Sequence, residues 1–155
     1  MILFGIPQTA RIVLLFQTEV DTVSQATGAS CPPVGASIPN GEAWRWVFAP
    51  MSERCFSPVA VRNPPRLSRA KDALEQCSCW GLSMHTSANA SIAAFKAVEA
   101  IFPRARKTLG THVAVGQLDG TIGIATPPDQ HGHFDLHPYK SAPFLAAFQT
   151  AGVIP

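Results

Sequence analysis

The stretch Trp80–Pro103, WGLSMHTSANASIAAFKAVEAIFP, constrains the fold more than any other part of the chain. Its first residues, Gly81–His85, alternate small or polar with apolar side chains, which is typical of a half-buried strand. Thr86 and Ser87 follow, and such side chains accept hydrogen bonds from the free N–H groups of a first helical turn. Apolar residues then recur at three- and four-residue steps until a proline, which cannot continue a helix. We expect a strand, a polar turn and a helix at about 88–102.

The rest of the chain supplies further elements of both types. Alternating or helical patterns predict strands near 11–17, 44–48, 112–118, 121–126 and 133–137, and helices near 69–77 and 142–151. Asp119-Gly120 is a strong hairpin signal, because both residue types tolerate positive φ, so 112–118 and 121–126 are expected to pair directly.

These elements predict an α+β fold with a single domain covering 1–155. The sheet is expected to be mixed or mainly antiparallel, with the long helix packed on one face and the shorter helices near 69–77 and 142–151. The stretch at about 22–40 is rich in Ser, Gly, Ala and Pro, and the stretch at about 50–65 closes with Asn63-Pro64-Pro65; both are expected to be irregular loops.

Composition narrows the class of protein. Hydrophobic residues make up 46% of the chain and charged residues only 14%, which is a globular composition with unusually few charges. The low charge suggests a surface covered by a protein partner or by a second copy in a homo-oligomer. The net charge of +2 gives no support for nucleic-acid binding. No apolar run approaches the roughly 20 residues of a membrane span, and no signal peptide is evident, so a cytoplasmic protein is expected.

Four cysteines are present, Cys31, Cys55, Cys77 and Cys79. They allow two disulfides in any of three connectivities. In the cytoplasm cysteines are usually reduced, so free and mostly buried thiols are expected.

A histidine-rich segment is the first candidate site. On an extended backbone His131, His133 and His137 point to one side together with Asp135, a set that suits zinc or another transition metal. Cys77–Cys79 would add thiolates if the fold brought them close. The spacing matches no common zinc motif, and the alternative is that these are ordinary loop histidines.

The turn at 83–87 is the second candidate site. Ser83, His85, Thr86 and Ser87 lie where the strand meets the helix, and the free N–H groups of a helix start attract phosphate. The alternative is that the hydroxyl groups only cap the helix.

The segment GLSMHTSANASIAAF resembles the second signature of the ADP-ribosyltransferase-like fold, which includes the RNA 2′-phosphotransferases. This resemblance covers only that short stretch and implies an NAD pocket beside the strand–helix turn. It also implies an upstream arginine or histidine on a strand, for which Arg45 is the counterpart. The family often adds a Glu-x-Glu or Gln-x-Glu pattern downstream, which is missing here, so His133 or Asp135 would have to replace it.

Three functions remain open. The leading one is a small enzyme or toxin-like factor that binds a nucleotide or NAD-type phosphate, with His85, His133 and Asp135 as catalytic groups. In that function Arg45 and the turn residues bind the substrate. The cofactor stays open, with NAD and zinc as the candidates. The alternatives are a non-catalytic binding or immunity-type protein, and a zinc-binding protein that uses the 131–137 histidines. The sequence lacks a glycine-rich phosphate loop, Gly-x-Ser-x-Gly and His-Glu-x-x-His, so the large enzyme classes with those motifs are not indicated.

Overall fold

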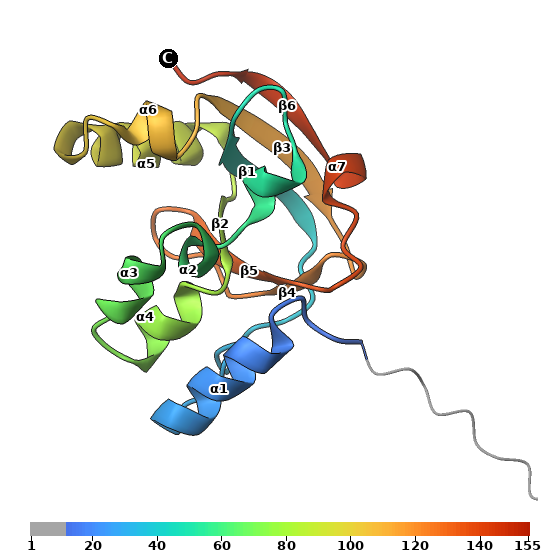
Figure 1. Cartoon of the computed structure of the whole chain (residues 1–155). Coiled ribbons are helices and arrows are strands. Elements are labelled where there is room, and N and C mark those ends of the chain that lie inside the picture. Colours follow the sequence, from blue (N-terminus) through green and yellow to red (C-terminus); the bar gives the residue numbers. More distant parts are fainter. Residues whose placement is uncertain (1–11) are drawn as a thin grey trace, which may run out of the picture.

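The computed structural model describes residues 12–155 as one α+β domain around a six-stranded sheet (Figure 1). The strands are β1 Gly41–Val47, β2 Leu82–His85, β3 His112–Leu118, β4 Gly123–Ala125, β5 His133–Pro138 and β6 Phe148–Val153. Their spatial order is β4-β5-β2-β1-β3-β6, and every neighbouring pair is antiparallel. The predicted fold class is confirmed.

The helices are α1 Gln17–Thr27, the 3₁₀ helix η1 Glu53–Phe56, α2 Val59–Arg62, α3 Pro64–Ser68, α4 Ala73–Ser78, α5 Ala88–Ile101, α6 Ala105–Thr108 and α7 Phe144–Ala147. The long helix α5 begins where the sequence predicts, because the Ser87 hydroxyl accepts the Ala90 N–H at 3.1 Å. It packs on the sheet as expected, through Phe95 against Trp46. Figure 1 shows α5 and α6 on one side of the molecule and α1, α3 and α4 grouped on another.

One face of the sheet carries the main hydrophobic core. Side chains that alternate along the strands, including Leu82, Met84 and Leu136, are fully buried on this face. α7 and η1 cover it, and the ring of Phe56 stacks on Phe144 at 4.7 Å between centroids.

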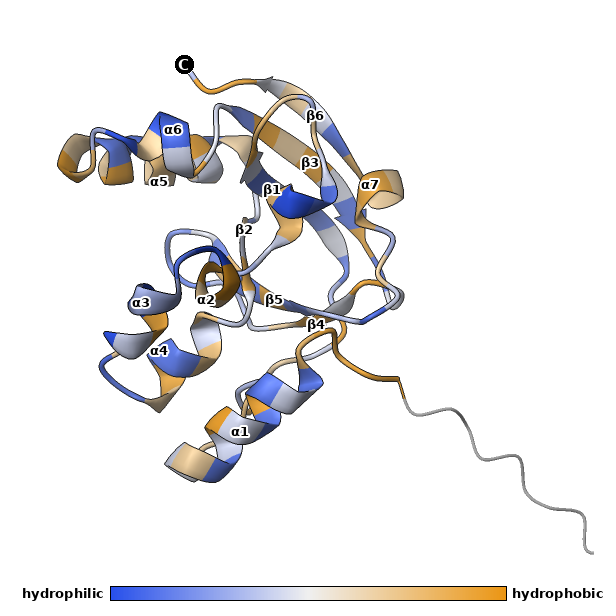
Figure 2. Ribbon diagram, viewed as in Figure 1, coloured by the Kyte–Doolittle hydropathy of each residue, from blue (hydrophilic) through white to orange (hydrophobic). Residues whose placement is uncertain are grey.

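The opposite face is covered in two separate places. α5 covers Trp44, Trp46 and Val113 at one end. At the other end α1 and α4 pack near β4 and form a second cluster. In Figure 2, α1 carries both hydrophilic and hydrophobic bands, and its buried residues are Val20 and Val23. The polar side chains of β2 and β5 lie on this face, between the two covered regions.

The sheet is weakly joined at its centre. β1 and β3 are paired along their whole length, whereas β1 and β2 share a single register pair, Trp44 with His85. The chain enters α5 at Ser87, two residues after this pair. His85 therefore stands where the two halves of the sheet meet.

The predicted hairpin between 112–118 and 121–126 is wrong. β3 pairs with β1 and β6, and β4 pairs with β5. The Asp119 carboxylate accepts both the backbone N–H of Thr121 at 2.8 Å and its hydroxyl at 2.6 Å. This local turn directs the chain away from β3, whose two edges pair with β1 and β6 in the folded sheet.

The predictions for the two chain ends are also wrong. In place of a strand at 11–17, Leu14 makes an isolated bridge to Tyr139 and helix α1 begins at Gln17; Arg11 lies outside the described residues. In place of a helix at 142–151, α7 ends at Ala147 and the chain continues as β6. The reason is that β6 pairs with the open edge of β3, which overrides the local helix pattern.

Shorter helices occupy parts of the predicted loops and of the predicted helix 69–77. The predicted helix begins only at Ala73, because the Asp72 carboxylate caps it by accepting the Glu75 N–H at 2.8 Å. α1 extends into 22–40, and η1, α2 and the first residues of α3 lie within 50–65. Within residues 12–155 no helix is both long enough and apolar enough to cross a membrane.

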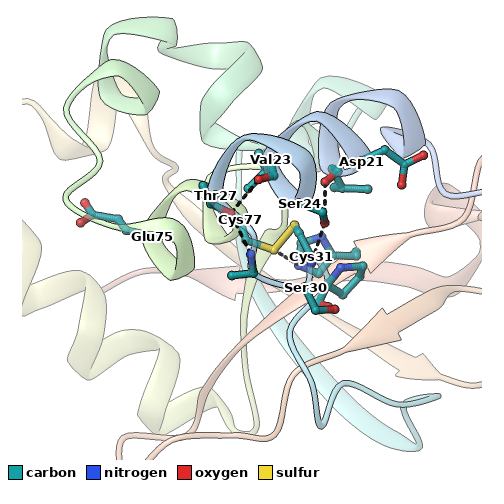
Figure 3. The surroundings of a disulfide bond; sticks show 12 residues. Asp21, Val23, Ser24, Thr27, Ser30, Cys31, Glu75 and Cys77 are labelled. Atoms are coloured by element: carbon teal, nitrogen blue, oxygen red, sulfur yellow. Dashed lines mark hydrogen bonds between the residues drawn. A yellow bond between two sulfur atoms is a disulfide. The ribbon is translucent and has the colours of Figure 1, made fainter.

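Two of the cysteines form a disulfide. Cys31, in the loop after α1, is bonded to Cys77 of α4, with Cα atoms 5.6 Å apart (Figure 3). Ser24 of α1 holds this loop, since its hydroxyl accepts the Cys31 N–H at 3.0 Å. The expectation of a free thiol is therefore wrong for this pair, and it is confirmed for Cys55 and Cys79, which are free and buried.

Candidate functional site

Strands β2 and β5 bring four predicted site residues onto one face of the sheet. In the antiparallel register Ser83 lies opposite Asp135, and His85 lies opposite His133. Because side chains alternate along a strand, all four project on the side where α5 packs, away from the main core. The structure thus joins the predicted turn to the predicted histidine segment.

The closest polar contact in this group joins Ser83 and His133. The serine hydroxyl oxygen lies 2.7 Å from Nε2 of the imidazole, and the serine is exposed. Two carboxylates flank the same ring: Asp129 Oδ2 is 3.9 Å from Nδ1, and Asp135 Oδ1 is 3.8 Å from Nε2. A hydroxyl, an imidazole and neighbouring carboxylates form the set that nucleophilic and acid–base catalysis use.

Asp129 is held in place by the backbone that follows it. Its Oδ1 accepts the N–H groups of His131 at 2.8 Å and of His133 at 3.0 Å. The N–H of His133 is the main reason that the pKa of Asp129 is lowered. This carboxylate is therefore ionised at neutral pH, and it lies beside the ring of His133.

His85 is the enclosed member of the group, with only 3% of its surface exposed. Its ring stacks on Trp46 at 5.8 Å and meets the ring of His133 edge-on at 5.4 Å. Burial, followed by the nearby His133, lowers the pKa of His85 to about 4. The ring is neutral at neutral pH, and its buried Nδ1 has no hydrogen-bond partner among residues 12–155.

Asp135 is also largely buried, and burial raises the pKa of its carboxyl group. A hydrogen bond from the Ser78 side chain and the nearby His133 oppose this rise. The two carboxylates beside His133 therefore differ: Asp129 is exposed and ionises readily, whereas Asp135 holds a proton more strongly.

Thr86 and Ser87 form the connection to α5. The N–H of Thr86 donates to the carbonyl of Gly132 at 2.9 Å, which ties the turn to the loop before β5. Gly132 has φ of +75°, and a Cβ there would meet Thr86 Oγ1 at 2.6 Å, so only glycine fits. Ser87 caps α5.

Arg45 lies on the opposite face of the sheet from these side chains. It is buried, and its guanidinium donates to the carbonyls of Cys55 at 2.7 Å, Ser83 at 2.8 Å and Ser57 at 3.3 Å. Burial is the main cause that lowers the pKa of Arg45 to about 10. The structure thus places it as an anchor for η1 and does not bring it to the hydroxyls of the turn.

The three histidines proposed as metal ligands do not meet. His133 contacts Ser83, His131 Nε2 lies 3.3 Å from the amide nitrogen of Gln130, and His137 is buried beside Cys77. Among residues 12–155, the one group of His, Cys, Asp or Glu ligand atoms close enough to share a metal is Cys31, Cys77 and His137.

Sequence reasoning missed two contributors to the site, Asp129 and Ser78. The Asp-x-x-Gly pattern at 129–132 is a turn signal and predicts an aspartate that binds backbone N–H groups. Ser78 gave no signal, because its contact with Asp135 depends on how α4 packs.

The sequence matches no known protein family, and comparisons with curated proteins and with solved structures likewise find no match. The geometry of the site is therefore the basis on which a function can be inferred.

Proposed function

We propose that this chain is a small group-transfer enzyme whose reacting centre is the pair Ser83 and His133. His133 acts as the acid–base group, Ser83 is the hydroxyl that it activates, and Asp129 stabilises the imidazolium. His85 and Asp135 complete the site as a neutral ring and a partly buried carboxyl group.

The observation that carries this proposal is the 2.7 Å contact between the Ser83 hydroxyl and His133 Nε2. A hydroxyl becomes a nucleophile when a base lies within hydrogen-bond reach and a third group orients that base. Asp129, 3.9 Å from the other ring nitrogen, has the position of that third group, and such contacts are often loose in the absence of substrate.

The proposed substrate is a nucleotide, including an NAD-type dinucleotide, bound through its phosphate at the start of α5. This helix has 14 residues, and its first N–H groups attract anions. Nδ1 of His85, two residues before Ser87, is buried and has no hydrogen-bond partner among residues 12–155, so the polar groups beside this helix start are not all satisfied. The resemblance of this stretch to ADP-ribosyltransferase-like proteins favours the same substrate class.

The test measures the turnover of a panel of nucleotides that includes NAD, with proton and phosphorus NMR as the readout. We expect the wild-type chain to convert at least one of them, and Ser83→Ala and His133→Ala to be slower by ~100-fold or more. His131→Ala is the matched control, since this histidine lies in the same segment, is exposed and has its ring beside the Gln130 amide rather than beside Ser83. No turnover of any nucleotide, or equal turnover by His133→Ala, would contradict the proposal.

A second candidate is a non-catalytic protein that binds a protein partner or a second copy of itself. The loop after α1 exposes two large apolar side chains, Val34 at 93% and Ile38 at 64%. Such side chains favour a contact surface. Light scattering of the purified chain checks this: a monomer whose mass does not change with concentration contradicts the homo-oligomer.

The cytoplasmic location remains a prediction. Disulfides are more common in oxidising compartments than in the cytoplasm, so the state of Cys31–Cys77 in cells bears on this prediction. Trapping the thiols with a mass-tagged alkylating reagent in intact cells reports that state. A cytoplasmic protein is expected to show both sulfur atoms reduced.

A further inference from the structure

A second polar group lies at the other end of β5, away from the proposed reacting centre. His137 is four residues beyond His133 on the same face of the strand, ~13 Å along it. It faces the disulfide between the loop after α1 and helix α4, with Nε2 3.9 Å from Cys77 Sγ.

The ring of His137 is enclosed but has little bonding. Only 2% of the residue is exposed, and Nδ1 has no hydrogen-bond partner in the part of the chain that the structure describes. The nearest partner of Nε2 is a sulfur atom, which is a weak acceptor. A buried imidazole with both nitrogens so poorly satisfied is unusual and needs an explanation.

We propose that Cys31, Cys77 and His137 form a zinc site when the disulfide is reduced. The redox state of the surroundings then determines whether the protein holds the disulfide or a bound zinc ion. Their ligand atoms already lie within 4.8 Å of one another. Two thiolates and a neutral imidazole are a ligand set that zinc accepts, with water or a further ligand at the fourth position.

The chemistry balances with a dithiol as the reductant. The dithiol gives two electrons and two protons to the Cys31–Cys77 bond and becomes a disulfide itself. The two thiols then lose their protons to solvent as both sulfur atoms bind zinc. Cys31 lies in a loop rather than in a helix or strand, so its sulfur can move away from Cys77 without unwinding α4.

The experiment measures zinc in the full chain, prepared without a histidine tag, before and after treatment with a phosphine reductant. We expect one zinc ion per chain in the reduced protein and none in the oxidised protein. Cobalt in place of zinc is expected to show the sulfur-to-metal charge-transfer band of thiolate ligands. Cys77→Ser and His137→Ala are expected to weaken binding by ~100-fold or more.

Cys79→Ser and His133→Ala serve as matched controls, because they remove a buried free thiol and a histidine on the same strand. Both are expected to bind zinc as the reduced wild type does. Equal zinc in the oxidised and reduced wild type, or equal loss in Cys79→Ser and Cys77→Ser, would overturn the proposal.

A thermal measurement keeps the test valid if a ligand variant does not fold. Zinc is expected to raise the Tm of the reduced wild-type chain and to leave that of the oxidised chain unchanged, because only the former binds the metal. An identical Tm with and without zinc in the reduced chain overturns the site. Neither result depends on nucleotide turnover at Ser83 and His133.

Discussion

At the scale of single residues, His85 makes the protein sensitive to acid. Its pKa is about 4 when folded and near 6.5 when unfolded, so between these values the unfolded chain binds a proton that the folded chain does not. The contribution to stability is complete above pH 6.5 and is lost as the pH falls toward 4. We expect the free energy of unfolding to fall by on the order of 3 kcal/mol from this source.

Urea unfolding at a series of pH values measures this effect. His85→Gln has no titrating ring, so its stability is expected to fall less steeply between pH 6.5 and 4 than that of the wild type. His131→Ala removes an exposed histidine and is expected to keep the wild-type slope. Parallel curves for His85→Gln and wild type would contradict the burial argument.

At the scale of elements, Arg45 of β1 joins the sheet to η1. Its guanidinium donates hydrogen bonds to the carbonyls of Cys55 and Ser57, in and next to η1, and to that of Ser83 in β2. Arg45→Ala would leave these acceptors enclosed without donors, and we expect a loss of ~3 kcal/mol in the free energy of unfolding. Arg54→Ala, an exposed change within η1, is expected to change stability by less than ~0.5 kcal/mol.

Chemical denaturation of the two variants tests the role of Arg45. A small effect of Arg45→Ala on stability, together with a large loss of activity in a folded protein, would instead assign Arg45 to the substrate. That result would restore the role implied by the resemblance to ADP-ribosyltransferase-like proteins.

The elements also differ in whether the local sequence is enough to predict them. α5 was predictable because Ser87 caps it and Pro103 follows it, and both signals lie within or next to the helix. The partners of β3 and the conversion of 148–153 into β6 were not, because they depend on which strand edge remains free. The Asp119-Gly120 signal was misleading for the same reason.

The candidate site likewise has one part that the local sequence predicts and another that depends on long-range pairing. Strand alternation places Ser83 with His85, and His133 with Asp135, from sequence alone. Which of these residues face one another depends on the register of β2 and β5, and that is a long-range property. The opposite face occupied by Arg45 and the pairing of Cys31 with Cys77 likewise follow only from the folded chain.

At the scale of the whole molecule, the disulfide links the loop after α1 to α4 across a separation of 46 residues. Closing a loop of this length restricts the unfolded chain, which corresponds to ~4 kcal/mol in the chain-entropy description. We expect reduction without zinc to lower the free energy of unfolding by up to this amount. Urea unfolding with and without reductant, in the presence of a chelator, measures this loss of stability. Equal midpoints would contradict the stabilising role of the disulfide.

The measurement that tests the central claim most directly is the imidazole NMR spectrum of the five histidines during a titration with NAD and with other nucleotides. If the turn and the histidine segment form one site, the signals of His85 and His133 are expected to shift together. The signal of His112, the first residue of β3, whose ring is hydrogen-bonded to the Thr111 hydroxyl, is expected to stay unchanged. No shift with any nucleotide, or shifts at His112 while His133 stays fixed, would contradict the account.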